Sequence, residues 1–176
     1  MFAPRTISPE IGYYLAGFAD GEGSFNISFR RRRSNYRFPW RVSACFNISQ
    51  RDKVILTLFK KHLRCGTMKQ RIDGVWYYEV NNLKAIRENI IPFFKYFGFL
   101  SAKKKSDFSK FCQIVKILDE KDYKTPEVLK EILEVRKKMN DGGKRKYGEE
   151  QILKAIESYP ESSETIRQTS GTRNRP

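Results

Sequence analysis

Polar and apolar residues alternate in two early stretches of the chain, as they do in strands that bury one face. Residues 24–33 begin with Phe or Ile at every second position, and the alternation resumes through residues 41–48 after a Ser-Asn turn signal. A second pair of strands is predicted at 67–72 and 75–81, because the Asp-Gly dipeptide between them is a strong hairpin signal. The two hairpins predict four antiparallel strands.

Helical spacing of apolar residues accounts for the segments around these strands. The first helix is expected to begin near Pro9, because Ser8 is a suitable N-cap and proline is tolerated at the first helical position. Further helices are predicted at 53–63, at 83–94 with a break at Pro92, and at 106–118, 126–139 and 149–159. The order α-β-β-α-β-β-α, followed by two more helices, predicts an α+β domain with helices on one face of an antiparallel sheet. Residues 1–160 are expected to form this single domain, and the polar residues 161–176 a disordered tail.

Basic residues outnumber acidic ones by 35 to 20, and the formal net charge of the 176 residues is +15. A polyanionic partner is therefore expected, with nucleic acid favoured over an anionic membrane surface. No apolar run approaches the roughly 20 residues that span a bilayer, and the N-terminus lacks the apolar segment of a signal peptide. These features predict an intracellular protein that does not insert into a membrane.

Cysteine and histidine are too scarce for several kinds of site. The three cysteines, Cys45, Cys65 and Cys112, are widely spaced and form no C-x-x-C pair. This spacing argues against a disulfide framework and against a structural zinc site. His62 is the single histidine of the chain, so a metal centre built on several histidines is also excluded.

One face of the predicted sheet carries donors and acceptors that suit base edges, with arginine matched to guanine and asparagine to adenine. A merely solvated face is the alternative, but four strands that share one cation-bearing face favour double-stranded DNA. A strand of roughly ten residues spans ~33 Å, close to ten base pairs at ~3.4 Å each, so one chain could follow one half of a long site. The residues expected to bind DNA are Asn26, Ser28, Arg30, Arg32, Arg41, Ser43, Asn47, Lys69, Arg71, Tyr77 and Glu79.

The first helix combines small residues with acidic residues at its end. Gly12, Ala16 and Gly17 remove side-chain bulk, which predicts a close seam with another helix. Glu22 lies between two glycines where the helix is expected to end, in conformations that glycine tolerates best. Asp20 and Glu22 would there form a negative cluster at the negative end of the helix dipole, which Mg²⁺ would stabilise. From the residue types alone, solvated loop acids remain the simpler interpretation.

Residues 15–23, LAGFADGEG, resemble the LAGLIDADG motif of homing endonucleases along its whole length. The resemblance covers roughly residues 9–118 and includes the segments FNISQRD (46–52) and LSAKKKSDF (100–108). It implies that Glu22 and the Gly21 carbonyl bind metal, and that Gln50 and Lys103 are a polar and a basic active-site residue, with Lys104 as the alternative lysine. Val54 departs from relatives that place a basic side chain nearby, and Lys53 is the candidate substitute.

The same resemblance implies a complete activity. A chain with one motif is expected to form a homodimer through its motif helices, here at Gly12, Ala16 and Gly17. Such a dimer would make staggered double-strand breaks in a long pseudo-palindromic DNA target by Mg²⁺-dependent phosphodiester hydrolysis, with no small-molecule cofactor. The family resemblance also implies a gene within an intron and an organellar location. The alternative is a non-cleaving nucleic-acid-binding protein of the same fold, such as an RNA maturase or a regulator.

Overall fold

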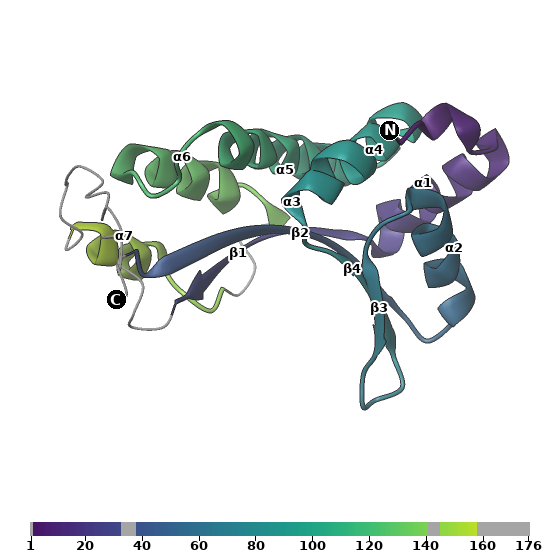
Figure 1. The fold of residues 1–176 in the computed structure, drawn as a ribbon, viewed down its shortest axis with the longest axis horizontal. Coiled ribbons are helices and arrows are strands. Elements are labelled where there is room, and N and C mark those ends of the chain that lie inside the picture. Colours follow the sequence, from purple (N-terminus) through teal and green to yellow (C-terminus); the bar gives the residue numbers. More distant parts are fainter. Residues whose placement is uncertain (1, 33–37, 141–144, 158–176) are drawn as a thin grey trace, which may run out of the picture.

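The computed structural model describes residues 2–32, 38–140 and 145–157, and its elements follow the predicted order (Figure 1). The first half of the chain contains a 3₁₀ turn (Pro4–Thr6), α1 (Pro9–Glu22), β1 (Ser24–Arg31), β2 (Trp40–Gln50), α2 (Lys53–Leu63), β3 (Thr67–Gln70) and β4 (Trp76–Val80). The second half contains α3 (Leu83–Ala85), a π-helical turn (Ile86–Ile90), α4 (Ile91–Phe97), α5 (Ala102–Glu120), α6 (Pro126–Lys137) and α7 (Glu149–Glu157). The predicted α+β fold is confirmed, whereas the predicted tail at 161–176 lies outside the described residues.

The strands of the described chain form one antiparallel sheet in the order β1-β2-β4-β3. Helices α3 to α6 lie over one face of the sheet, and the β3–β4 hairpin projects away from this helical layer (Figure 1). Phe25 anchors the buried face, with its ring centroid 5.1 Å from Phe46 and 5.0 Å from Phe111. Because side chains alternate along a strand, burial of these phenylalanines turns the intervening polar residues toward the opposite face.

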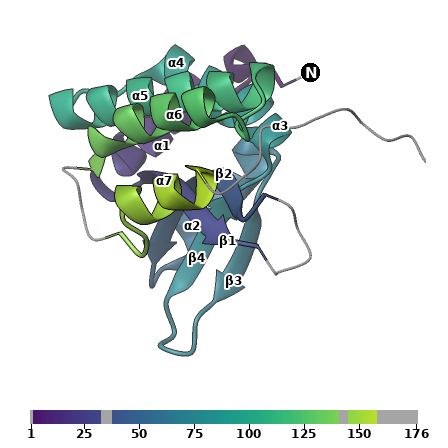
Figure 2. The same cartoon turned by 90° about the vertical axis from the view of Figure 1, so that its left-hand side faces the viewer.

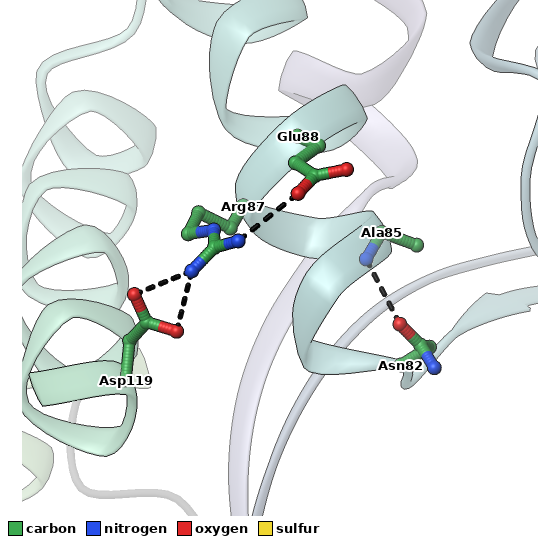
Figure 3. Close-up of polar contacts among 5 residues, drawn as sticks. All are labelled: Asn82, Ala85, Arg87, Glu88 and Asp119. Atoms are coloured by element: carbon green, nitrogen blue, oxygen red, sulfur yellow. Dashed lines mark hydrogen bonds and ion pairs between the residues drawn. The ribbon is translucent and has the colours of Figure 1, made fainter. Parts of the chain in front are cut away.

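The segment predicted as one helix at 83–94 is divided by the π-helical turn. Pro92 is the second residue of α4, which continues directly from the π-helical turn, so the predicted break becomes a change of helical pitch. Arg87, in the π-helical turn, donates to both carboxylate oxygens of Asp119 in α5, at 2.7 and 2.6 Å (Figure 3). The side chain of Asn82 caps α3 by accepting the Ala85 N–H at 2.9 Å (Figure 3).

Helices α6 and α7 cover the free edge of β1. In Figure 2, α7 lies below α6 and beside the strands. Arg136 Nε donates to the Ile27 carbonyl, and Asn140 Nδ2 donates to the Phe25 carbonyl, both at 3.0 Å. These bonds occupy acceptors that an open strand edge would offer to another chain. Within the described residues, none of the helices is long and apolar enough to cross a membrane.

Candidate active site and nucleic-acid interface

The motif helix α1 ends in an extended residue instead of a left-handed one. Gly23 follows Glu22 with φ −75° and ψ 147°, a conformation open to any residue. The helix ends where predicted, but the predicted reason, a backbone conformation that favours glycine, is wrong. Glycine is required here by space, because a Cβ on Gly23 would lie 2.7 Å from the Ala19 carbonyl oxygen. Gly21 is the penultimate residue of α1, and carbonyls in the last turn of a helix lack intrahelical partners.

The two motif acids have separate surroundings. Asp20 Oδ2 accepts the backbone N–H groups of Leu100 at 3.0 Å and Ser101 at 2.9 Å, and its Oδ1 accepts the Ser101 hydroxyl. Burial raises the pKa of Asp20, but these hydrogen bonds outweigh it and leave the pKa below its usual value. Asp20 therefore joins the end of α1 to the start of α5, and its metal-binding cluster with Glu22 stays a prediction.

Glu22 remains exposed at the end of α1. Lys104, in the first turn of α5, donates its ammonium group to the Gly23 carbonyl beside it. Burial lowers the pKa of Lys104, and the carboxylates of Asp20, Asp107 and Glu22 partly offset this effect. The structure thus brings Lys104 to the motif, while Lys103 is exposed one position earlier. The role predicted for Lys103 stays a prediction.

Gln50 reaches the same end of the sheet through the strand register. Ser24, the first residue of β1, pairs with Asn47, so the last residues of β2 lie beside the end of α1. Gln50 pairs with Trp76 of β4. Because side chains alternate along a strand, Gln50 lies on the opposite face from the polar side chains of β2. Its half-buried side chain is therefore a terminal residue of β2 near the motif, outside the sheet face predicted to bind DNA.

The register places the predicted DNA-binding residues other than Arg32 and Arg71 on one sheet face, here named the polar face. Arg71 follows the end of β3, and its guanidinium lies 3.7 Å from the Asp73 carboxylate in the turn, so its role stays a prediction. Partners across antiparallel strands point to the same side, and the predicted residues are partners of one another. Arg32 differs, because its guanidinium donates at 3.1 Å to the hydroxyl of Tyr123, between α5 and α6. The pairs that define the face are Asn26 with Cys45, Ser28 with Ser43, Arg30 with Arg41, Asn47 with Glu79, and Lys69 with Tyr77.

Cys45 lies in the middle of the polar face, which the residue types did not indicate. Its thiol donates to Glu79 Oε1 at 3.4 Å, and Asn47 Nδ2 contacts the sulfur at 3.7 Å. Burial raises the pKa of Cys45 to about 12, so the thiol stays protonated at neutral pH. It can therefore donate to Glu79, the one acidic residue among those predicted to bind DNA. The register adds three further residues that the prediction omitted, although their alternation with the apolar positions could have shown them: Ser24, Ser49 and Thr67.

The small residues of α1 divide between two sides of the helix. A Cβ on Gly12 would meet the Phe97 ring at 2.0 Å, and Ala16 is 2% exposed, so both face the chain's own core. Their prediction as interface residues is corrected accordingly. Gly17 is exposed with nothing within 4 Å of an added Cβ. It shares the outer side of α1 with Tyr13 and Tyr14, which are 60% and 56% exposed.

A basic antiparallel sheet below a helical layer, with a carboxylate at the end of its first helix, defines a nucleic-acid-processing class of α+β protein. Residues 15–115 match the sequence model of the LAGLIDADG endonuclease family. The chain is 30% identical over 150 residues to homing endonuclease I-ApeII of Aeropyrum pernix, an alignment that covers 81% of this chain and 88% of that protein. The chain belongs to the LAGLIDADG endonuclease family.

Some of the other relatives are longer than this chain. It is 31% identical over 133 residues to a probable intron-encoded endonuclease of Neurospora crassa, covering 73% of this chain but 29% of that protein. The structure of I-SmaMI bound to cleaved DNA superposes with a TM-score of 0.69 at 31% identity, covering 76% of this chain and 45% of the other. I-TnaI, a homing endonuclease, superposes with a TM-score of 0.70 at 26% identity, covering 88% and 99%.

Proposed function

We propose that this protein is a homodimeric, site-specific DNA endonuclease that hydrolyses phosphodiesters with Mg²⁺. The observation that carries the proposal is the placement of Glu22. Its exposed carboxylate ends α1 beside Lys104 and the end of β2, at one end of the polar face. A duplex that binds along that face would bring a backbone phosphate to this carboxylate.

The donor atoms fit a metal that is shared with the substrate. Among the described residues, no group of three or more His, Cys, Asp or Glu side chains could hold a metal ion alone. Mg²⁺ is commonly held by one or two carboxylates together with phosphate oxygens and water. Glu22 and the Gly21 carbonyl would supply the hard oxygen ligands, and a second chain would supply a second carboxylate. When bound, Mg²⁺ would stabilise negative charge on the attacking and leaving oxygens.

Neighbouring side chains have roles that follow from their positions. The Lys104 ammonium, held by the Gly23 carbonyl, would stabilise the charge that develops on the phosphate. Gln50 carries both donor and acceptor atoms and would orient the attacking water at the end of β2. Because these groups come from three separate elements, the chemistry depends on the junction of α1, β2 and α5.

A homodimer would complete the site. The chain covers 45% of the I-SmaMI chain but 99% of I-TnaI, so one copy of this fold corresponds to half of the larger relative. The outer side of α1, with Gly17, Tyr13 and Tyr14, offers a helix surface that a second copy could cover. Packing there would bring two Glu22 carboxylates together and predict a pseudo-palindromic target with staggered cuts.

The location follows less directly. The intron-encoded relatives of Neurospora crassa support an intron origin and an organellar location, as the family resemblance implied.

The decisive experiment compares Glu22→Gln with wild type on a randomised duplex library, with and without Mg²⁺. The variant should lose cleavage and keep its DNA-binding free energy within about 1 to 2 kcal/mol, because the amide is isosteric and the polar face dominates binding. Glu120→Gln is the matched control, since this carboxylate is 55% exposed on α5. Cleavage by Glu22→Gln at the wild-type rate would refute the assignment, whereas tight RNA binding by a wild type that never cuts DNA would favour the maturase alternative.

A further inference from the structure

A basic pocket lies where α6 and the segment before α7 meet the edge of β1. It encloses about 380 Å³ and includes Asn26 and Ser28, two residues of the polar face. The pocket is therefore continuous with the surface proposed to bind DNA. The remaining polar lining residues come from α6 and the segment before α7, and are Arg136, Asn140, Arg145 and Lys146.

Arg136 is the unusual member of this lining. It is 8% exposed, its Nε donates to the Ile27 carbonyl, and its guanidinium stacks 4.8 Å from the centre of the Phe29 ring. One terminal nitrogen, NH1, is buried and has no hydrogen-bond partner among the described residues. A buried donor without a partner is unfavourable, and the penalty is larger for a charged group. This incompletely paired guanidinium belongs to a residue that lines the pocket.

The charges around the pocket leave an excess of cations. Burial, together with the nearby Arg145, lowers the pKa of Arg136 to about 10, so Arg136 remains charged at neutral pH beside a second guanidinium. The carboxylate of Glu149 lies 3.7 Å from Arg145 and also pairs with Lys137 at 3.6 Å. Asp107 is occupied with the Asn140 N–H at 3.0 Å. The exposed ammonium of Lys146 adds another positive charge at the rim.

We propose that this pocket, formed by α6, the segment before α7 and the edge of β1, binds a backbone phosphate of the DNA that lies on the polar face. The inference rests on the proposed function, since it assumes that duplex DNA occupies that face. Phosphate contacts fix the register of a protein on a duplex while base contacts give specificity. The two appended helices would thus position the sheet on its target, beyond covering a strand edge.

Lys146→Ala tests this role, because it removes a pocket charge from an exposed side chain. Lys116→Ala is the control, since this lysine is 73% exposed on α5, outside the pocket. The measurement is the dissociation constant for a mixed-sequence duplex between about 50 and 200 mM salt. Loss of one phosphate contact should reduce the slope of log affinity against log salt concentration by about 1 for each bound chain. Between about 50 and 200 mM salt, the loss of affinity should then be about 3.5-fold smaller for the variant than for wild type. The control should match wild type.

Three outcomes would overturn the proposal. Equal salt slopes for Lys146→Ala, Lys116→Ala and wild type would show that the protein binds DNA without a phosphate contact in the pocket. A second arm titrates inorganic phosphate at constant ionic strength and follows the melting temperature. Stabilisation by phosphate that depends on Lys146, with unchanged DNA slopes, would show a site for the free anion instead. A wild-type protein that binds no duplex would overturn the proposed function and this inference together.

Discussion

Replacement of Gly12 by alanine should destabilise the folded chain, although alanine normally favours a helix. The new Cβ would lie 2.0, 2.1 and 2.6 Å from three carbon atoms of the Phe97 ring. Carbon atoms prefer about 3.5 Å or more, so the ring would have to move by about 1.5 Å. The neighbouring rings of Phe93 and Tyr13, with centroids at 4.9 and 5.3 Å, restrict that movement. Overpacking of this kind costs about 1 to 3 kcal/mol.

Gly17→Ala is the matched control on the same helix. Nothing in its own chain lies within 4 Å of its added Cβ, so folding of the monomer should show only the gain of about 0.5 to 1 kcal/mol that alanine brings to a helix interior. That gain is common to both variants, and their difference in unfolding free energy should equal the overpacking cost. For a chain of this size, each kcal/mol corresponds to about 2 to 4 °C, so the melting temperatures should differ by about 2 to 12 °C.

Differential scanning calorimetry at several protein concentrations separates folding from assembly, because dimerisation makes the melting temperature depend on concentration. Combining Gly12→Ala with Phe97→Leu should recover part of the lost stability, since the smaller side chain vacates the space that the Cβ needs. Equal melting temperatures for Gly12→Ala and Gly17→Ala, together with weaker dimerisation of Gly12→Ala, would refute the packing argument and return Gly12 to the interface.

The remaining predictions concern the two charged neighbours of Glu22. Asp20→Asn should lower the unfolding free energy at neutral pH by about 1 to 3 kcal/mol, because it weakens the charge-assisted bonds to Leu100 and Ser101. The folded state lowers the Asp20 pKa, so this contribution to stability is full above the unfolded pKa of about 3.9 and is lost as the pH falls through the folded pKa. The unfolding free energies of the wild type and Asp20→Asn, measured by denaturation at a series of acidic pH values, should therefore converge. A constant difference between the two free energies across that pH range would contradict the prediction. Lys104→Met should slow cleavage about 100-fold or more and exceed the effect of Lys103→Met; single-turnover rates showing the reverse order would restore Lys103 as the active-site lysine.

Local pattern in the sequence determined the elements of this fold. The alternation that contains Phe25, the Asp-Gly turn and the proline starts of α1 and α6 each act within a few residues, so they can be recognised without knowing what packs against them. The same alternation placed the polar side chains on one face, and the strand register confirmed it. The motif at 15–23 identified the family, because nine specified positions carry more information than composition.

Contacts between distant segments decided the roles of individual residues. Gly12 and Gly17 are both small residues of one helix, but only the position of Phe97, 85 residues later, distinguishes a core contact from an open surface. Likewise, Asp20 and Glu22 are both acids at the end of a helix, and only the N-terminus of α5 separates a structural acid from an exposed one. The choice between Lys103 and Lys104 and the one unpaired terminal nitrogen of Arg136 also depend on tertiary contacts. Sequence periodicity specifies which side of an element is buried, whereas the identity of the neighbour that covers it is a property of the assembled chain.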